Sequence, residues 1–225
     1  VGQSPAMVEL YDMLEVIGPA DATVLIRGES GTGKELVARA IHEESARGDA
    51  PFVAINCGAI PADLLEAELF GHAKGAFTGA VNAREGRFAH AGRGTLFLDE
   101  IGEMSADLQI KLLRVLEERV YEPLGSSQSI PFEARVVAAT NRDLEAAVAA
   151  GEFREDLFHR LNVLGVDLPP LRERGPEDIL FLFEHFLTEL NEKHGTRLEG
   201  VVPLAQGFLT GYEWPVGEQS ASGRT

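Results

Sequence analysis

The sequence predicts an α/β fold built on one parallel β-sheet with helices on both of its faces. Short apolar, β-branched segments alternate along the chain with segments whose apolar residues recur at helical spacing. Strands that alternate with helices imply a parallel sheet, and the helices cover its two faces. The five predicted strands cover residues 22–27, 51–56, 94–100, 134–140 and 162–168.

Helices are predicted from apolar spacing and from residues that favour helix ends. Five apolar residues share one face of a first short helix: Met7, Leu10, Met13, Leu14 and Ile17. The end signals are Pro61 at the start of a helix that runs to Phe70, Ser105 and Asp143 as N-caps, and Gly151 as a stop.

The alternation of strands and helices ends at Leu168-Pro169-Pro170, and two helices are predicted beyond it, over 176–193 and 203–212. We therefore expect an α/β subdomain over residues 1–170, with a glycine-rich insertion at 71–84. A small all-helical subdomain is expected over 171–215. Serine, glycine and glutamine dominate 216–225, which predicts a disordered or non-native tail.

Composition narrows the classes of function. The formal net charge of −16 over 225 residues argues against a sequence-independent DNA-binding surface, which needs clustered lysine and arginine. No apolar run is long enough to span a bilayer, so no membrane association is expected. Cys57 is the only cysteine, and a reducing cytoplasm is the natural setting. The six histidines lack ligand-like spacing, and a chain that begins with Val1 is expected to be a piece of a longer protein.

A glycine-rich turn between the first predicted strand and a helix is the first candidate site. It consists of Gly28, Glu29, Ser30, Gly31, Thr32, Gly33, Lys34 and Glu35. This context is typical of a P-loop, in which backbone N–H groups and the helix N-terminus cradle phosphates and the lysine reaches the β- and γ-phosphates. The alternative is a plain strand-turn-helix. Glu35 stands where a serine or threonine usually binds Mg²⁺.

Two adjacent acids, Asp99 and Glu100, end the third predicted strand, where ligands of an open parallel sheet bind. One acid there can hold Mg²⁺ and the other can take a proton from attacking water; alternatively, both only solvate the strand end. Asn141, after the fourth strand, could orient water near a γ-phosphate or be an ordinary turn residue. Asn56, after the second strand, could bond Glu100 or cap a turn.

Arg154 and Arg160 are six residues apart, and both are candidates for stabilising charge in a phosphoryl transition state. The alternative is pairing on a helix surface, because Arg160 follows Asp156 by four residues.

Together these motifs resemble the central AAA+ domain of bacterial enhancer-binding proteins, the NtrC-like activators of sigma-54 RNA polymerase. The resemblance covers about Val1 to Pro215. Besides the P-loop and the segment Gly94–Glu100, it rests on three stretches: Glu68-Leu69-Phe70-Gly71-His72, Gly75-Ala76-Phe77-Thr78-Gly79-Ala80 and Leu168-Pro169-Pro170-Leu171-Arg172-Glu173-Arg174. The hexapeptide of the second stretch is the most specific mark.

The resemblance implies a three-layer αβα P-loop AAA+ fold, followed by a helical lid, and an ATPase that assembles into a ring of six or seven copies. Residues 28–35 would bind ATP, Asp99 would serve Mg²⁺ and Glu100 would activate water. Asn56 matches a switch residue that restrains the glutamate, and Asn141 matches a sensor of the γ-phosphate. Arg154 and Arg160 would reach into a neighbouring subunit.

The hexapeptide Gly75, Ala76, Phe77, Thr78, Gly79 and Ala80 would be the tip of a mobile loop that contacts sigma-54; the alternative for Phe77 is burial in a tight turn. Residues 120–132 would form a second loop that transmits the nucleotide state. The family shares Glu35. After Trp214-Pro215, however, the chain departs from the family's Gly-Asn-Val-Arg-Glu-Leu, so the arginine expected in the lid is missing and Arg224 is out of register. We expect an incomplete lid.

The expected function is ATP-driven remodelling of the sigma-54 RNA polymerase holoenzyme for open-complex formation in the bacterial cytoplasm. DNA binding is expected to lie outside this fragment. Two alternatives remain. One is a nucleotide-binding module that is impaired in hydrolysis, and the other is an AAA+ remodeller of another protein.

Overall fold

A computed structural model describes residues 2–215 of the chain, which divide into two compact units. We call residues 14–27 and 34–167 the sheet unit, and the described residues among 1–13, 28–33 and 168–225 the helical unit. The predicted tail at 216–225 and the departure from the family's lid sequence lie outside the described residues. Within 2–215, no helix combines the length and the apolar character that crossing a membrane requires.

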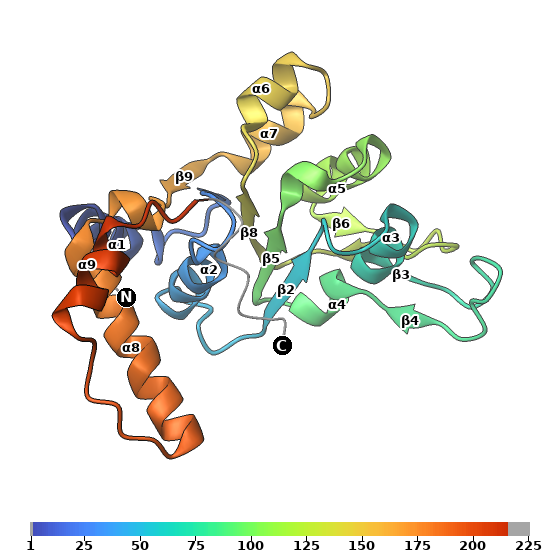
Figure 1. The fold of residues 1–225 in the computed structure, drawn as a ribbon. Coiled ribbons are helices and arrows are strands. Elements are labelled where there is room, and N and C mark those ends of the chain that lie inside the picture. The colour runs from blue at the N-terminus through green and yellow to red at the C-terminus, as the bar shows by residue number, and fades with distance from the viewer. Residues whose placement is uncertain (1, 216–225) are drawn as a thin grey trace. The chain divides into compact units, whose positions relative to one another are not determined.

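Five parallel strands form the central sheet of the sheet unit (Figure 1). In spatial order they are β2 (Phe52–Asn56), β5 (Thr95–Asp99), β8 (Arg135–Thr140), β1 (Val24–Arg27) and β9 (Leu164–Asp167). Every neighbouring pair is parallel, and the register places Asn56 beside Asp99. The predicted five-stranded parallel sheet is confirmed, with strand boundaries that coincide with the predicted ones or lie one or two residues inside them.

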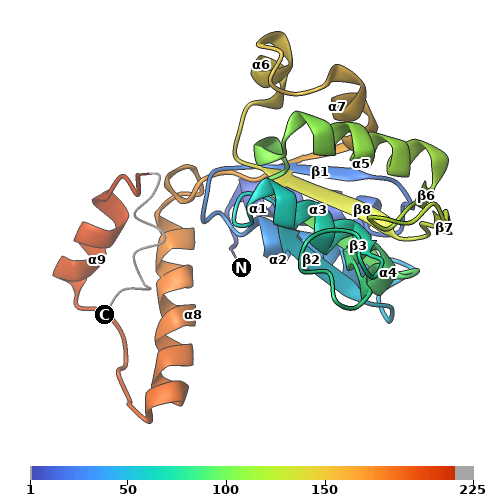
Figure 2. The ribbon, with the colours of Figure 1, turned by 90° about the vertical axis from the view of Figure 1, so that its right-hand side faces the viewer.

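Both faces of the sheet are covered by helices, because alternate strand residues are apolar on each face. Leu25, Leu96 and Ala138 belong to a buried cluster with α3 (Ala62–Phe70), α5 (Ala106–Glu118) and α7 (Glu155–Leu161). On the opposite face α2 (Lys34–Glu43) contacts β1, β5 and β8. Figure 2 shows α5 and α2 on opposite sides of the strands.

The remaining short elements of the sheet unit fall between these strands. They are β3 (Gly71–His72), β4 (Arg84–Glu85), α4 (Arg87–Ala91), a 3₁₀ turn (Ile101–Glu103), β6 (Val120–Tyr121), β7 (Ile130–Pro131) and α6 (Leu144–Ala149). The antiparallel pair β6–β7 lies within residues 120–132, the segment expected to form a second loop. The glycine-rich insertion starts and ends in the antiparallel pair β3–β4.

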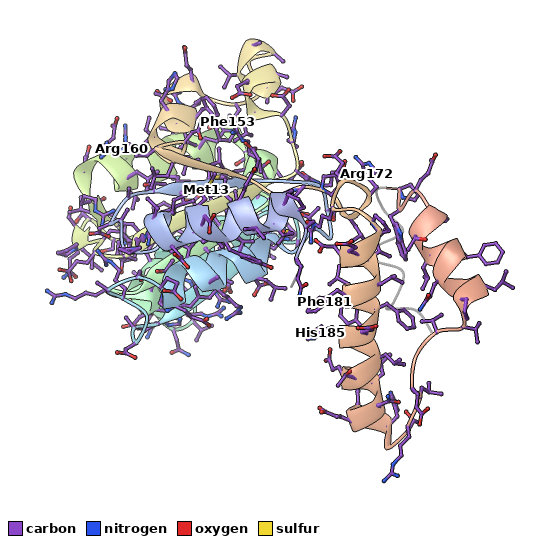
Figure 3. The ribbon with its side chains drawn as sticks, turned by 90° about the vertical axis from the view of Figure 1, so that its left-hand side faces the viewer. Met13, Phe153, Arg160, Arg172, Phe181 and His185 are labelled. Atoms are coloured by element: carbon purple, nitrogen blue, oxygen red, sulfur yellow. The ribbon has the colours of Figure 1, made fainter. Side chains whose placement is uncertain are left out.

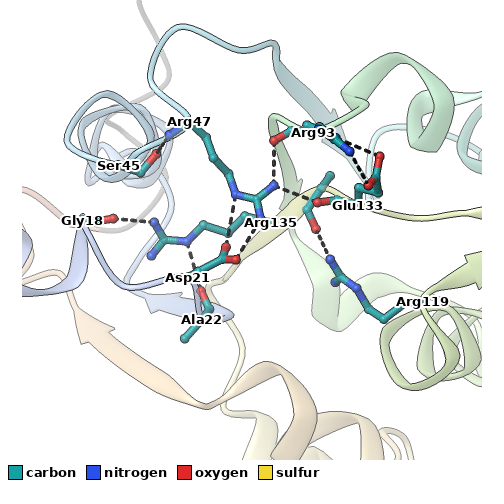
Figure 4. A network of polar contacts seen from close by, with 10 residues as sticks. Gly18, Asp21, Ala22, Ser45, Arg47, Arg93, Arg119, Glu133 and Arg135 are labelled. Atoms are coloured by element: carbon teal, nitrogen blue, oxygen red, sulfur yellow. Dashed lines mark hydrogen bonds and ion pairs between the residues drawn. The ribbon is translucent and has the colours of Figure 1, made fainter.

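The buried side chain of Arg135 anchors the N-terminal end of β8 (Figure 4). The guanidinium of Arg135 donates to the carbonyl oxygens of Gly18, Ile17 and Ala22 at 2.7, 2.9 and 3.0 Å. Burial lowers the pKa of Arg135, while the nearby Asp21 carboxylate acts in the opposite direction. These three bonds join the segment before β1 to the start of β8.

The helical unit contains α8 (Pro176–His194), α9 (Pro203–Gly211), a 3₁₀ turn (Leu171–Glu173) and the first part of α1 (Pro5–Ile17). Asp178 is fully buried and accepts hydrogen bonds from the Gln3 amide, the Ser4 amide and the Ser4 hydroxyl at 2.6, 2.9 and 2.7 Å. Figure 3 labels Phe181 and His185, which are spaced one helical turn apart on α8. Both helices predicted after Pro170 are confirmed.

Two details of the predicted helices are wrong. Met13 was predicted on the buried face of the first helix, but 42% of it is exposed while its four apolar companions are buried. Ser105 occupies the N-cap position of α5, but its side chain makes no capping hydrogen bond. Asp143 does cap α6, because its carboxylate accepts from the Ala146 amide at 2.9 Å.

Candidate active site

The predicted polar residues of the sheet unit lie at the carboxyl ends of adjacent strands. Asn56 ends β2, Asp99 ends β5, Asn141 follows β8, and Lys34 opens the helix that follows β1 in the chain. The strand order β2-β5-β8-β1 makes these strand ends neighbours. This edge of an open parallel sheet is where ligands bind.

Lys34 is a buried cation in this group, with 8% of the residue exposed. Burial lowers the pKa of Lys34, whereas the negative charges of Asp99 and Glu100 raise it. The two carboxylates are therefore close enough to favour the charged ammonium group. The arrangement places one cation and two anions at the same end of the sheet.

Glu100 sits in a backbone conformation that is unusual for a residue with a side chain. Its φ and ψ are 52° and 45°, in the left-handed region, and the 3₁₀ turn Ile101–Glu103 begins directly after it. The Asp99 carboxylate accepts from the Glu100 amide at 3.0 Å. Non-glycine residues held in this region concentrate at functional sites.

Asn56 bonds to Asp99 and to the following turn. Its amide donates to Asp99 Oδ2 at 3.3 Å, and its carbonyl oxygen accepts from the Gly58 and Ala59 amides at 2.9 Å each. The Glu100 carboxylate lies directly against Gly58, since an added Cβ there would collide with Glu100 Oε2. Of the two alternatives for Asn56, the turn cap is observed. Its role as a switch for Glu100 stays a prediction.

Asn141 is exposed at the end of β8, and its neighbours hold the strand end in place. The Thr140 hydroxyl accepts from the Arg142 amide at 3.0 Å. The Arg142 guanidinium donates to the Gly102 carbonyl at 2.8 Å, and it also pairs with the Glu152 carboxylate. Arg142 therefore links the turn after Glu100 to the segment before α7.

The predicted phosphate loop, residues 28–33, belongs to the helical unit. Gly31 and Gly33 have φ of 82° and 99°, which only glycine adopts without strain. The Thr32 hydroxyl donates to the Glu29 carbonyl at 2.8 Å and closes the turn. Glu35, the eighth residue of the motif, forms an ion pair with Arg39 at 2.7 Å on the surface of α2.

Two arginines that sequence reasoning did not assign hold this loop. Arg172 donates to both carboxylate oxygens of Glu29 at 2.7 and 2.5 Å, and Arg174 donates to the Thr32 carbonyl at 2.9 Å. Arg174 is buried and also donates to the Pro169 carbonyl at 2.9 Å. Both residues lie within a stretch that carried the family resemblance, which is the signal that could have found them.

Arg154 and Arg160 make their contacts with α5 and α7 rather than with the acid pair. The Arg154 side chain donates to both carboxylate oxygens of Asp156 at 3.0 and 2.6 Å. Arg160, labelled in Figure 3, donates to the Leu116 carbonyl at 3.1 Å. Asp156 is therefore held by Arg154, not by the helix-surface pairing with Arg160 that the spacing suggested.

The predicted partner-binding hexapeptide forms the tip of the loop between β3 and β4. The Gly75 amide donates to the Ala80 carbonyl at 2.8 Å, and Gly75 and Gly79 have φ of 83° and 110°. Phe77 is 46% exposed, with its ring 5.0 Å from that of His72. Burial of Phe77 in a tight turn was the alternative, and this exposure excludes it.

Among the described residues, no group of three or more His, Cys, Asp or Glu side chains could hold a metal ion unaided. Asp99 is a single partly exposed carboxylate at the sheet edge. Mg²⁺ commonly binds proteins through one or two carboxylates together with substrate phosphates and water. Asp99 therefore fits a Mg²⁺ that arrives with a nucleotide.

Comparisons with known proteins point to one family. A family model described as the Sigma-54 interaction domain matches residues 1–167. Transcriptional regulatory protein ZraR of Salmonella typhimurium is 53% identical over 215 residues, covering 96% of this chain and 48% of ZraR. Regulatory protein AtoC of Escherichia coli is 53% identical over 212 residues, covering 94% of this chain and 46% of AtoC.

Among solved structures, NtrX from Brucella abortus superposes with a TM-score of 0.89 at 38% identity, covering 95% of this chain and 48% of that one. A structure of NtrX in complex with ATP gives a TM-score of 0.88. The chain spans about half the length of the curated relatives it matches. It belongs to the Sigma-54 interaction domain family, the AAA+ P-loop domains of NtrC-like transcriptional activators.

Proposed function

We propose that this chain hydrolyses ATP to ADP and phosphate. The observation that carries the proposal is the grouping of Lys34 with Asp99 and Glu100 at the carboxyl edge of the sheet. A cation there can bind nucleotide phosphates, and a carboxylate beside it can accept a proton. The glycine-rich residues 28–33 precede Lys34 directly in the sequence and supply backbone N–H groups.

Each residue at the edge has a separate task in this proposal. Lys34 binds the β- and γ-phosphates, and Glu100 accepts a proton from the attacking water. Asp99 would hold Mg²⁺, which neutralises charge that develops on the phosphates. Asn141 orients the water, and Asn56 maintains the turn against which the Glu100 carboxylate rests.

The arginines act on a neighbouring copy. Arg154 and Arg160 contact α5 and α7 and not the acid pair of their own chain. We therefore assign their guanidinium groups to the nucleotide of a second molecule in a ring of six or seven. NtrX, a relative at 38% identity, has been solved with ATP, which supports nucleotide binding here. Arginines supplied in trans contribute about 10³–10⁵ in rate, so the isolated chain should be nearly inactive.

The output would pass through the loop between β3 and β4 to the sigma-54 RNA polymerase holoenzyme, in the bacterial cytoplasm. Phe77 presents an exposed aromatic ring between two glycines with positive φ. Such a tip can move at little cost, and an exposed aromatic side chain is a common anchor in protein contacts. A net charge of −16 disfavours direct DNA binding, so we assign DNA contact to other parts of the assembly.

The test of hydrolysis is the ATPase rate per chain measured against protein concentration. A steep rise is expected, because the active sites form only on assembly. Lys34→Ala and Glu100→Gln should abolish the rate, while Glu43→Ala, at an exposed position at the far end of the same helix, serves as the control. A rate that stays at zero at every concentration would contradict the proposal.

The test of the partner is crosslinking from a photoreactive group at Phe77 to purified sigma-54, with an ATP transition-state analogue. A crosslink that requires the analogue is expected. A matched probe at Val81, which is 73% exposed just outside the hexapeptide, controls for chance proximity. Equal crosslinking from both positions, or none from Phe77, would count against sigma-54 as the partner of this loop.

A further inference from the structure

Gln109 is a buried polar residue that hydrogen-bonds to two separate segments of the sheet unit. It lies on α5 next to the apolar residues Leu108 and Leu112, and only 1% of it is exposed. A buried side-chain amide requires hydrogen-bond partners for both its nitrogen and its oxygen. The partners of Gln109 come from two segments that flank the candidate site.

The Gln109 amide uses both of its ends. Nε2 donates to the Met104 carbonyl at 2.9 Å and to the Glu152 carbonyl at 3.2 Å. Oε1 accepts from the backbone amide of Arg154 at 2.9 Å. Two carbonyl acceptors on one side and an N–H donor on the other allow a single orientation of the amide, so the side chain is fixed.

These partners belong to functionally different segments. Met104 directly follows the 3₁₀ turn Ile101–Glu103, which starts at the left-handed residue Glu100. Within that turn the Glu103 amide donates to the Glu100 carbonyl at 3.0 Å. Arg154 is the N-cap residue of α7. Gln109 therefore connects the backbone after the proposed base to the backbone of an arginine proposed to act on a neighbour.

A second connection runs beside the first. Arg142 donates to the Gly102 carbonyl at 2.8 Å and pairs with the Glu152 carboxylate, so it joins the same two segments by different atoms. Gln109 and Arg154 also line a hollow of about 360 Å³ together with Glu152 and Asp156. A displacement of the turn after Glu100 would thus move the backbone at Arg154, because the Gln109 amide and the Arg142 guanidinium both connect the two segments.

We propose that Gln109 is a positioning residue that sets the direction of Arg154 according to the state of the Glu100 turn. This inference rests on the proposed ATPase function and deepens it. One copy's acid-bearing turn then controls the arginine which that copy presents to the next. Gln109 touches no substrate, and its effect on hydrolysis passes through Arg154 to the neighbouring site.

Mixing of variants tests this directionality. Arg154→Ala binds nucleotide but donates no arginine, whereas Lys34→Ala donates the arginine but binds no phosphate. An equal mixture of these two should recover ATPase activity, and this recovery tests arginine donation itself. Gln109→Met, which keeps the side-chain volume and removes all three hydrogen bonds, should lower turnover about a hundredfold, the effect of a displacement near 1 Å.

The decisive comparison pairs Gln109→Met with each partner. A mixture of Gln109→Met and Lys34→Ala should recover activity. The Gln109→Met copies keep intact nucleotide sites, and the Lys34→Ala copies supply correctly placed arginines to those sites. Mixed with Arg154→Ala, Gln109→Met should not recover, since both variants fail in the same donation. The opposite pattern, or full activity of Gln109→Met alone, would overturn the proposal.

A readout independent of hydrolysis separates this inference from the proposed function. Hydrogen exchange of the Arg154 amide should speed up at least tenfold in Gln109→Met and change less in Gln109→Glu, which keeps the acceptor oxygen. Thr95→Val, which removes a buried hydrogen bond to His42 on the opposite face, is the control for general destabilisation. If the Arg154 amide exchanges equally fast in all four proteins, Gln109 does not position this arginine, whatever the ATPase result.

Discussion

Replacing Glu100 by glycine should give a more stable protein than replacing it by alanine, and both changes remove the proposed base. Glu100 has φ 52° and ψ 45°. A residue with a Cβ adopts this left-handed conformation at a cost of about 1–2 kcal/mol. Glycine avoids that cost but loses about 0.4–1 kcal/mol through the greater freedom of its unfolded chain. The difference leaves Glu100→Gly more stable than Glu100→Ala by roughly 0.5–1 kcal/mol.

This comparison isolates the backbone, because alanine and glycine both remove the carboxylate and its repulsion with Asp99. For a protein of this size, 1 kcal/mol shifts the melting temperature by about 2–4 °C, so the expected difference is roughly 1–4 °C. Thermal and urea unfolding of Glu100→Ala, Glu100→Gly and Glu100→Gln measure it, and all three should lack ATPase activity. A glycine variant no more stable than the alanine variant would show that the conformation at Glu100 carries no strain.

Three further predictions concern Arg172, Asp178 and Cys57. Arg172→Ala should weaken ATP binding about 2–10-fold in a fluorescent-nucleotide titration, because ordering the loop at Glu29 then costs about 0.5–1.5 kcal/mol on binding; unchanged affinity would rule out a role for this pair. Burial raises the pKa of Asp178, but hydrogen bonds from Ser4 and the Gln3 and Ser4 amides outweigh it and hold that pKa below its ordinary 3.8. The contribution of the Asp178 carboxylate to the free energy of unfolding is therefore complete well above pH 3.8, and it is lost as the pH falls through the lower pKa of the folded state. In urea unfolding, Asp178→Asn should lose less stability on acidification than the parent. Burial, together with the charges of Asp99 and Glu100, raises the pKa of Cys57 to about 12, so iodoacetamide at pH 8 should alkylate it only after unfolding; rapid labelling of the native chain would contradict this.

The sheet could be predicted from the sequence because the pattern that marks each strand lies within a few consecutive residues. Each strand is a short apolar run bounded by turn residues, and Asp99 interrupts its run where the strand ends. The helix α4 (Arg87–Ala91) was not predicted. It has five residues between Gly86 and Gly92, too few for an apolar period to be recognised.

The residues that hold the candidate site in place were harder to find, since their partners are distant in sequence. Arg172 and Glu29 are separated by 143 positions, and Gln109 and Arg154 by 45. A glutamine at the border of an apolar stripe looks like an ordinary surface residue of an amphipathic helix. Only the packed structure shows that Gln109 is buried and that its amide joins two segments.

Arg154 and Arg160 lie in different electrostatic surroundings, so the proposed function gives them different tasks. Arg154 is paired with Asp156 and borders a hollow that Glu152 and Glu155 also line. An incoming phosphate must therefore compete with the Asp156 carboxylate for the Arg154 guanidinium.

Arg160 instead shares a hollow of about 390 Å³ with Arg119, Arg135 and Asp21. Burial lowers the pKa of Arg119, the positive charges of Arg47 and Arg160 lower it further, and the Asp21 carboxylate raises it. An anion entering this hollow meets several positive charges and one carboxylate, that of Asp21, which already pairs with Arg47 at 2.9 Å. Under the proposed function, Arg160 would attract the neighbour's nucleotide, whereas Arg154 would first exchange Asp156 for the phosphate, and the contact through Gln109 would govern that exchange.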